Sequence, residues 1–161
     1  MAKKILIAID GSEASMKSLW YVSETIGGCK EIKITLLSIL PEVSKGLENL
    51  LGPDYINAIP GFRDKVGNIE QLKRQREDEM KAALERGKEL LKKTGIPEEN
   101  IDIKVRSKKE GIAKDILREL EKGGYDTIVV GRRGLTGAFF MGSISDKIVK
   151  YAKNCAVWVV D

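Results

Sequence analysis

Hydrophobic residues follow two alternating patterns along this 161-residue chain. Five short apolar segments rich in Ile, Val and Leu have the length and composition of β-strands. Between them, apolar residues recur at the 3.6-residue spacing of amphipathic helices. The first and fourth segments are almost continuously apolar, as is typical of strands buried on both faces, whereas the third alternates and is predicted to lie at a sheet edge. The predicted strands span residues 4–10, 32–40, 101–105, 127–131 and 156–160.

The predicted helices lie between these strands. Ser12 is a good N-cap for the first, and Ser143, with Asp146 in capping-box spacing, is predicted to cap the last. The longest helix is predicted over about 69–94, with an apolar stripe that Arg76 interrupts and a charged face that we interpret as solvent-exposed. The predicted buried faces are Met16, Leu19, Trp20 and Ile26; Ile69, Leu72, Met80, Ala83, Leu84, Gly87, Leu90 and Leu91; Ile112, Ile116, Leu117 and Leu120; and Ile144, Ile148, Val149 and Ala152.

This order of elements predicts a three-layer, doubly wound α/β fold of the Rossmann-like type, with helices on both faces of a parallel sheet. Such a sheet has a crevice beyond the carboxyl ends of its strands, where the strand order reverses. Residues 1–161 are predicted to form one domain with a long insertion at about 41–67, which prolines and glycines keep from being one continuous helix. A connection of that length is more often functional than inert, so we expect it to cover a pocket or to contact a partner.

Composition narrows the classes of function. The net charge of +4 results from 28 basic and 24 acidic residues, a nearly balanced surface that does not predict nucleic-acid binding. The chain has no histidine, which removes histidine-dependent catalysis. Cys29 and Cys155 lack metal or redox spacing, and we interpret both as small buried hydrophobic residues. With no long apolar run and no signal-peptide pattern, we expect a cytoplasmic protein that does not contact membranes.

The segment between the fourth strand and the last helix has the features of an anion site. It holds four glycines in twelve residues, from Gly131 to Gly142, which let the backbone approach a ligand closely. The helix that follows offers free N–H groups and a partial positive charge, Ser143 adds a hydroxyl, and Arg132 and Arg133 add charge. No lysine follows Gly142, so this is not a Walker A motif. On glycine spacing alone, a plain glycine-rich connection with two solvated arginines remains an alternative.

Asp10 ends the first predicted strand at the expected switch point. Its carboxylate suits a ribose hydroxyl, or a magnesium ion near phosphates. The Asp-Gly-Ser sequence is also a good turn and helix start, in which the aspartate accepts hydrogen bonds from backbone N–H groups. We favour the binding role, because Asp10 and the glycine-rich segment are expected to meet at the same crevice.

Residues 4–15 (KILIAIDGSEAS), 125–137 (YDTIVVGRRGLTG), 142–149 (GSISDKIV) and 155–160 (CAVWVV) together resemble the universal stress protein family. The resemblance implies a strand order of 3-2-1-4-5 and the binding of ATP or AMP. A magnesium ion held by Asp10 could accompany the nucleotide. The resemblance also implies which residues bind. They are Ala8, Ile9 and Ile39 at the adenine, Asp10 at the ribose, and Val130, Gly131, Arg133, Gly134, Gly142, Ser143 and Ile144 at the phosphates and ribose.

The last predicted strand is short and hydrophobic, and an exposed edge of that kind needs covering. The resemblance likewise implies that family members pair this strand across a two-fold axis. We therefore expect a homodimer formed through the strand of Ala156, Val157, Trp158, Val159 and Val160.

The chain departs from the family pattern in one loop. Nucleotide-binding members have nine residues between the second glycine and the Gly-Ser pair, whereas seven separate Gly134 from Gly142. The leading hypothesis is a dimeric stress-response module that binds an adenine nucleotide. The alternative is a dimerisation or docking module without nucleotide, and a slow magnesium-dependent ATP hydrolase using Asp10 comes third. No catalytic set and no metal-ligand set of residues is predicted.

Overall fold

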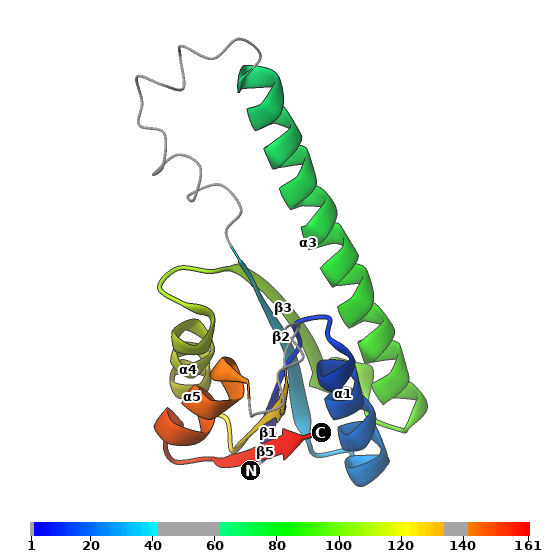
Figure 1. The fold of residues 1–161 in the computed structure, drawn as a ribbon. Helices are drawn as coiled ribbons and strands as arrows, with labels where there is room; N and C mark the ends of the chain where they lie inside the picture. Colours follow the sequence, from blue (N-terminus) through cyan, green and yellow to red (C-terminus); the bar gives the residue numbers. More distant parts are fainter. Residues whose placement is uncertain (1, 42–61, 134–141) are drawn as a thin grey trace.

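The computed structural model describes residues 2–41, 62–133 and 142–161, with the backbone alone for residues 62–68 (Figure 1). Its described strands form one parallel five-stranded sheet in the order β3-β2-β1-β4-β5, which confirms the predicted fold class. The elements are β1 (Lys4–Ala8), α1 (Glu13–Ile26), β2 (Lys33–Leu40), α3 (Phe62–Lys93), a 3-10 turn (Glu98–Asn100), β3 (Ile101–Ser107), α4 (Ile112–Gly123), β4 (Thr127–Gly131), α5 (Ser143–Tyr151) and β5 (Ala156–Val160).

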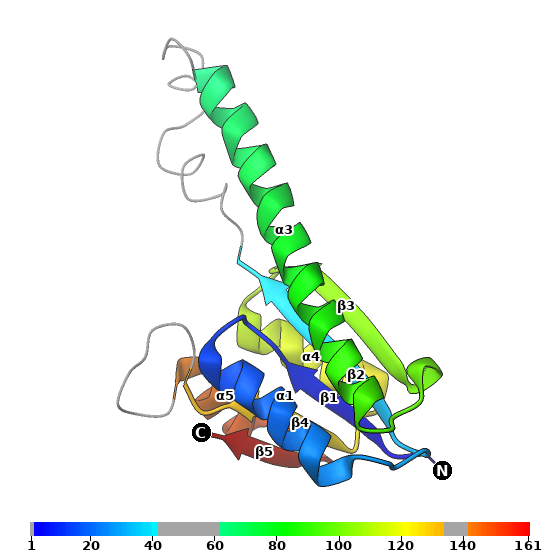
Figure 2. The ribbon, with the colours of Figure 1, turned by 90° about the vertical axis from the view of Figure 1, so that its right-hand side faces the viewer.

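The strand at the centre of the sheet divides the core between the two faces. Along β1, successive side chains point to opposite faces, as in any strand. Ile5 and Ile7 belong to the cluster under α1 and α3, whereas Leu6 belongs to the cluster under α4 and α5. Figures 1 and 2 show these two helix layers on either side of the sheet. The almost continuous apolar sequence of β1 therefore follows from burial on both faces.

Helix α3 is longer than predicted. It begins at Phe62 rather than near residue 69, so the last part of the predicted insertion is helical, and the rest of the insertion lies outside the described residues. Leu84 and Leu91 in its carboxyl-terminal half are fully buried against the sheet. Its amino-terminal half extends beyond the sheet (Figure 2), which is why Leu72 is 40% exposed although it continues the same apolar stripe.

Two further residues that were predicted to lie in the core are exposed in the structure. Trp20 on α1 is 58% exposed, and Val149 on α5 is 45% exposed. The buried face of α1 includes three serines, Ser15, Ser18 and Ser23, alongside its apolar residues. Their hydroxyls bond to backbone carbonyls one turn back, so these small side chains can be buried and bring the helix close to the sheet. The face with the large aromatic ring therefore points outward.

Several local predictions have clear outcomes. The oxygen Oγ of Ser12 accepts a hydrogen bond from the N–H of Ser15 at 3.2 Å, so the predicted N-cap of α1 is confirmed. The cap of α5 is Gly142 rather than Ser143, which is the first helical residue, because the N–H of Asp146 bonds to the Gly142 carbonyl. Cys29 is exposed, contrary to the prediction. None of the described helices is long and apolar enough to cross a membrane.

Candidate functional site

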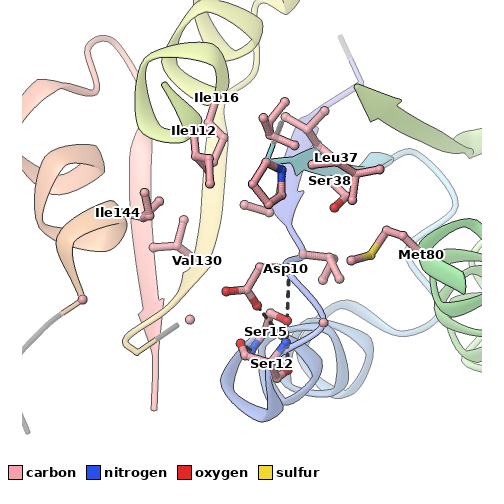
Figure 3. A pocket seen from close by; sticks show the side chains of 18 of the residues that line it. Asp10, Ser12, Ser15, Leu37, Ser38, Met80, Ile112, Ile116, Val130 and Ile144 are labelled. Atoms are coloured by element: carbon pink, nitrogen blue, oxygen red, sulfur yellow. Dashed lines mark hydrogen bonds between the residues drawn. The ribbon is translucent and has the colours of Figure 1, made fainter. Parts of the chain in front are cut away.

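A cavity of about 680 Å³ lies at the carboxyl ends of β1, β2 and β4 (Figure 3). This volume is in the range typical of small-molecule sites. The strand order reverses here, since β1 is followed in sequence by β2 on one side of it and has β4 on the other. The cavity is therefore at the switch point where the doubly wound fold predicts a ligand.

The structure brings almost all of the predicted binding residues to this one cavity. Gly134 lies outside the described residues, as do the seven residues between it and Gly142. Whether the lining residues bind a ligand stays a prediction. Those that line the cavity are Ala8, Ile9, Asp10, Ile39, Val130, Gly131, Arg133, Gly142, Ser143 and Ile144.

A tight turn after β1 holds the Asp10 carboxylate at the cavity wall. The oxygen Oδ1 of Asp10 accepts a hydrogen bond of 2.8 Å from the N–H of Ser12. The hydroxyl of Ser15 lies 2.9 Å from the Ser12 carbonyl and accepts a 3.4 Å bond from the N–H of Asp10. The local role expected of Asp-Gly-Ser is thus real, and it orients the carboxylate. Asp10 is exposed, so its other oxygen can accept hydrogen bonds from a ligand.

The Arg132 carbonyl ties the end of β4 to the start of α5. It accepts a 2.8 Å bond from the N–H of Gly142, and the hydroxyl of Ser145 lies 2.8 Å from it. Ser145 is buried, and no pattern in the sequence predicts this role. The first N–H groups of a helix have no partner within it, so the start of α5 presents donors at the cavity.

The two arginines of this segment have different surroundings. Arg133 lines the cavity, and its buried Nε has no hydrogen-bond partner among the described residues. Its ion-pair partner is Asp161, whose Oδ1 lies 3.7 Å from Nε. Arg132 is exposed, does not line the cavity, and forms a closer ion pair of 2.9 Å with Asp161. Of the two charges, only that of Arg133 is therefore placed to meet a ligand.

Gly131 lets helix α1 pack closely against the end of β4. A Cβ atom at this position would lie 2.9 Å from the carbonyl carbon of Ala14 and 3.0 Å from its Cβ. These distances are shorter than normal contacts, so the absence of a side chain lets the first turn of α1 approach the end of β4. Close packing against α1 is a role that the sequence does not predict for this glycine.

One wall of the cavity comes from residues that the sequence analysis did not assign to the site. Ser38 comes from β2, while Arg76, Glu79 and Met80 come from α3 (Figure 3). The four positions 76, 79, 80 and 83 fall on one helical face, and that spacing was visible in the sequence. Arg76, Met80 and Ala83 lie on the predicted apolar stripe of α3, but the sequence does not show that this stripe reaches the end of β2.

The loop before α4 is held by a buried carboxylate. Burial opposes ionisation of Asp115, but N–H groups of Lys109 and Glu110 donate to it at 2.7 and 3.3 Å, and the net effect is a lowered pKa. The ionised carboxylate fixes residues 109–111 at the start of α4. This positions Ile112, which lines the cavity.

Comparison with known proteins identifies relatives over the whole chain. The model of the universal stress protein family matches residues 1–161. The chain is 28% identical over 162 residues to universal stress protein YxiE of Bacillus subtilis, covering 99% of both. It also resembles the solved structure of universal stress protein UspA from Lactobacillus plantarum, with a TM-score of 0.76, 17% identity, and coverage of 99% of this chain and 98% of that one.

Two further solved structures contain adenine nucleotides. A universal stress family protein from Arabidopsis thaliana has AMP bound, with a TM-score of 0.59, 19% identity, and coverage of 98% of this chain and 90% of that one. A universal stress protein from Archaeoglobus fulgidus is in complex with dAMP, with a TM-score of 0.63, 16% identity and full coverage of both chains. At these identities the likeness establishes the shared fold.

Proposed function

Because the chain belongs to the universal stress protein family, we propose that its cavity binds an adenine nucleotide and that the protein acts as a dimeric, ligand-responsive stress module. The observation that carries this proposal is the buried Nε of Arg133, which has no hydrogen-bond partner among the described residues and lies at the cavity beside the start of α5. A buried donor without a partner is costly, and an anion at this place would satisfy it.

The phosphate end of the ligand lies at β4 and α5 in this proposal. The start of α5 supplies free N–H groups and a partial positive charge. Arg133 supplies a full positive charge, only partly neutralised by Asp161 at 3.7 Å. Ser143 is exposed at the first position of the helix, where its hydroxyl can also donate. A phosphate group matches this set of donors.

The ribose and base follow along the strand ends. Neighbouring strands are about 4.8 Å apart, so the ends of β4, β1 and β2 span about 10 Å in all. A nucleoside monophosphate has a similar length, and it places its ribose beside Asp10 at the end of β1. Its base then meets the apolar end of the cavity, where Ala8 and Ile39 lie. Relatives of this fold with AMP and with dAMP bound support the choice of adenine.

Calorimetric titration of the protein with AMP, and with ATP and magnesium, tests the proposal. The unaltered protein is expected to bind both. Arg133→Gln should weaken AMP binding about tenfold or more, since a hydrogen bond from a charged donor contributes roughly 1.5–3 kcal/mol. Adenosine, which lacks the phosphate, should lose little affinity in the same variant.

Arg86→Gln is a matched control, because Arg86 is exposed on α3 and does not line the cavity. Asp161→Asn should strengthen AMP binding or leave it unchanged, since it frees Arg133 from its carboxylate. If neither AMP nor ATP with magnesium binds at millimolar concentration, the proposal is rejected. The seven-residue separation of Gly134 and Gly142 would then favour the docking module.

We further propose that the protein forms a homodimer through β5. This strand ends the described sheet and pairs only with β4 there. Val159 is 39% exposed, and Tyr21 packs edge to face on Trp158 with ring centroids 6.2 Å apart. These residues border a shallow hollow of about 370 Å³ along the strand. An apolar sheet edge of this kind is expected to be covered by a second copy.

A further inference from the structure

Ser38 has a buried hydroxyl that no described group satisfies. Only 1% of the residue is exposed, and its Oγ has no hydrogen-bond partner in the described part of the chain. Other buried serines differ in this respect, since the hydroxyls of Ser18 and Ser23 donate to backbone carbonyls of α1 at 2.9 and 2.7 Å. More than nine in ten buried polar groups have partners, so this exception calls for an explanation.

The surroundings of Ser38 are apolar. The register of the sheet pairs Ser38 with Val105 of β3, and the N–H of Ile9 bonds to the carbonyl of the preceding residue, Leu37. Ile9 and Val105 both belong to the core face under α1 and α3. Ser38 and Met80 of α3 lie on the same side of the cavity, opposite Val130 and Ile144 (Figure 3). The described residues around Ser38 therefore offer its hydroxyl no hydrogen bond.

A ligand bound in the cavity, by contrast, can supply a hydrogen-bond partner for this hydroxyl. Ser38 lies at the end of β2, about 10 Å along the strand ends from Gly131 on β4, since one strand lies between them. A nucleotide with its phosphate at α5 and its ribose at Asp10 has its base at this position. The base is the only part of such a ligand that reaches the end of β2.

We propose that the Ser38 hydroxyl hydrogen-bonds the polar edge of the purine, with Met80 of α3 on the same wall of the cavity. This inference rests on the proposed function, and it adds the side chain of Ser38 to the predicted contact of Ile39 at the end of β2. A hydroxyl can both donate and accept, so it can pair with a ring nitrogen or with an exocyclic amine. Ser38 is only 1% exposed, so little water competes for that bond.

We expect Ser38→Ala to maintain or raise the stability of the free protein and to lower its affinity for AMP. In the free protein the substitution removes a buried polar group that lacks a partner, so stability should stay equal or rise, by up to about 2–4 °C in Tm for a chain of this size. In the complex it removes a hydrogen bond, so AMP should bind about two- to tenfold more weakly. A serine that served only the fold would lower Tm when replaced.

Calorimetry with AMP and adenosine, together with thermal unfolding of the free protein, tests this inference. Adenosine should lose the same factor as AMP in Ser38→Ala, because the contact is to the base and not to the phosphate. Ser23→Ala is the matched control: this serine is equally buried, lies outside the cavity and donates to the Trp20 carbonyl. The control should lower Tm and leave the affinity for AMP unchanged.

The outcomes separate this inference from the proposed function. If the unaltered protein binds AMP and Ser38→Ala binds it equally well, the inference is overturned while the proposed function stands. A loss seen with AMP but not with adenosine places Ser38 at the phosphate and also overturns it. If the unaltered protein binds neither ligand, both proposals fall together.

Discussion

Small side chains decide how closely the elements of this protein approach one another. Serines on α1 are buried because their hydroxyls bond to carbonyls of the same helix, which brings the helix backbone near the sheet. At the end of β4, Gly131 leaves room for Ala14 at distances that a Cβ would not allow. The geometry of the cavity at the end of β4 therefore depends on residues whose role is packing.

Gly131→Ala is expected to destabilise the protein by about 1–3 kcal/mol, the usual effect of an extra methyl group in a well-packed place. The added Cβ would lie 2.9 Å from the backbone of Ala14, which cannot move without shifting α1. Urea denaturation followed by circular dichroism measures the change. An unaltered midpoint would show that α1 shifts freely. Substitutions at Gly131 are consequently poor tests of ligand binding, and Arg133 is the better position.

Two elements carry functions beyond their share of the core. The carboxyl-terminal half of α3 buries Leu84 and Leu91, and residues near the middle of the helix, Met80 and Arg76, line the cavity. At the opposite edge of the sheet, β5 has exposed apolar residues beside α1. The first element forms part of the candidate ligand site, and the second is the edge that the proposed dimer would use.

The edge of β5 gives a direct test of the proposed dimer. Light scattering at micromolar concentration is expected to give twice the chain mass of 17.9 kDa. Val159→Lys puts a charge on the edge and should shift the protein toward the monomer, because charged edges resist strand pairing. Val149→Lys is the control, since Val149 is equally exposed but lies on α5. A monomeric mass for the unaltered protein would contradict the proposal.

At the scale of the whole molecule, several carboxylates tie neighbouring elements together. Glu119 of α4 is 2.7 Å from Lys104 of β3, also contacts Arg106 at 3.3 Å, and accepts a 3.1 Å bond from the Tyr125 hydroxyl. Burial raises the pKa of Glu119, but these cationic and hydroxyl partners more than offset it, so its pKa lies below the ordinary value of 4.5. Asp115 likewise has a lowered pKa.

A lowered carboxyl pKa adds stability that is present above the unfolded value and is lost as the pH falls through the folded value. The free energy of unfolding is therefore expected to fall progressively below about pH 4.5. Between pH 6 and 8 it should change little, because the chain has no histidine to titrate there. Thermal unfolding from pH 8 to pH 3 measures both regions. Glu119→Gln should flatten the acid part, and equal acid sensitivity in that variant would contradict this account.

The sequence by itself determined the fold class, the family and most of the candidate site. Hydrophobic periods of two and 3.6 residues depend only on neighbours within one strand or helix. The parallel order of the strands then brings Asp10, Arg133 and Gly142 together at the carboxyl ends of the strands. For the same reason, the cap of α1 at Ser12 was predicted correctly. These features follow from local physics together with the general rules of sheet topology.

Only the tertiary structure decided which faces are covered and which polar groups lack partners. Trp20 is exposed because α1 packs through its serines, and Arg76 reaches the cavity because α3 lies beside the end of β2. Ser38 became a candidate only once its hydroxyl was seen to be buried without a partner among the described residues. Burial and hydrogen-bond satisfaction depend on elements distant in the sequence, so no local pattern contains them.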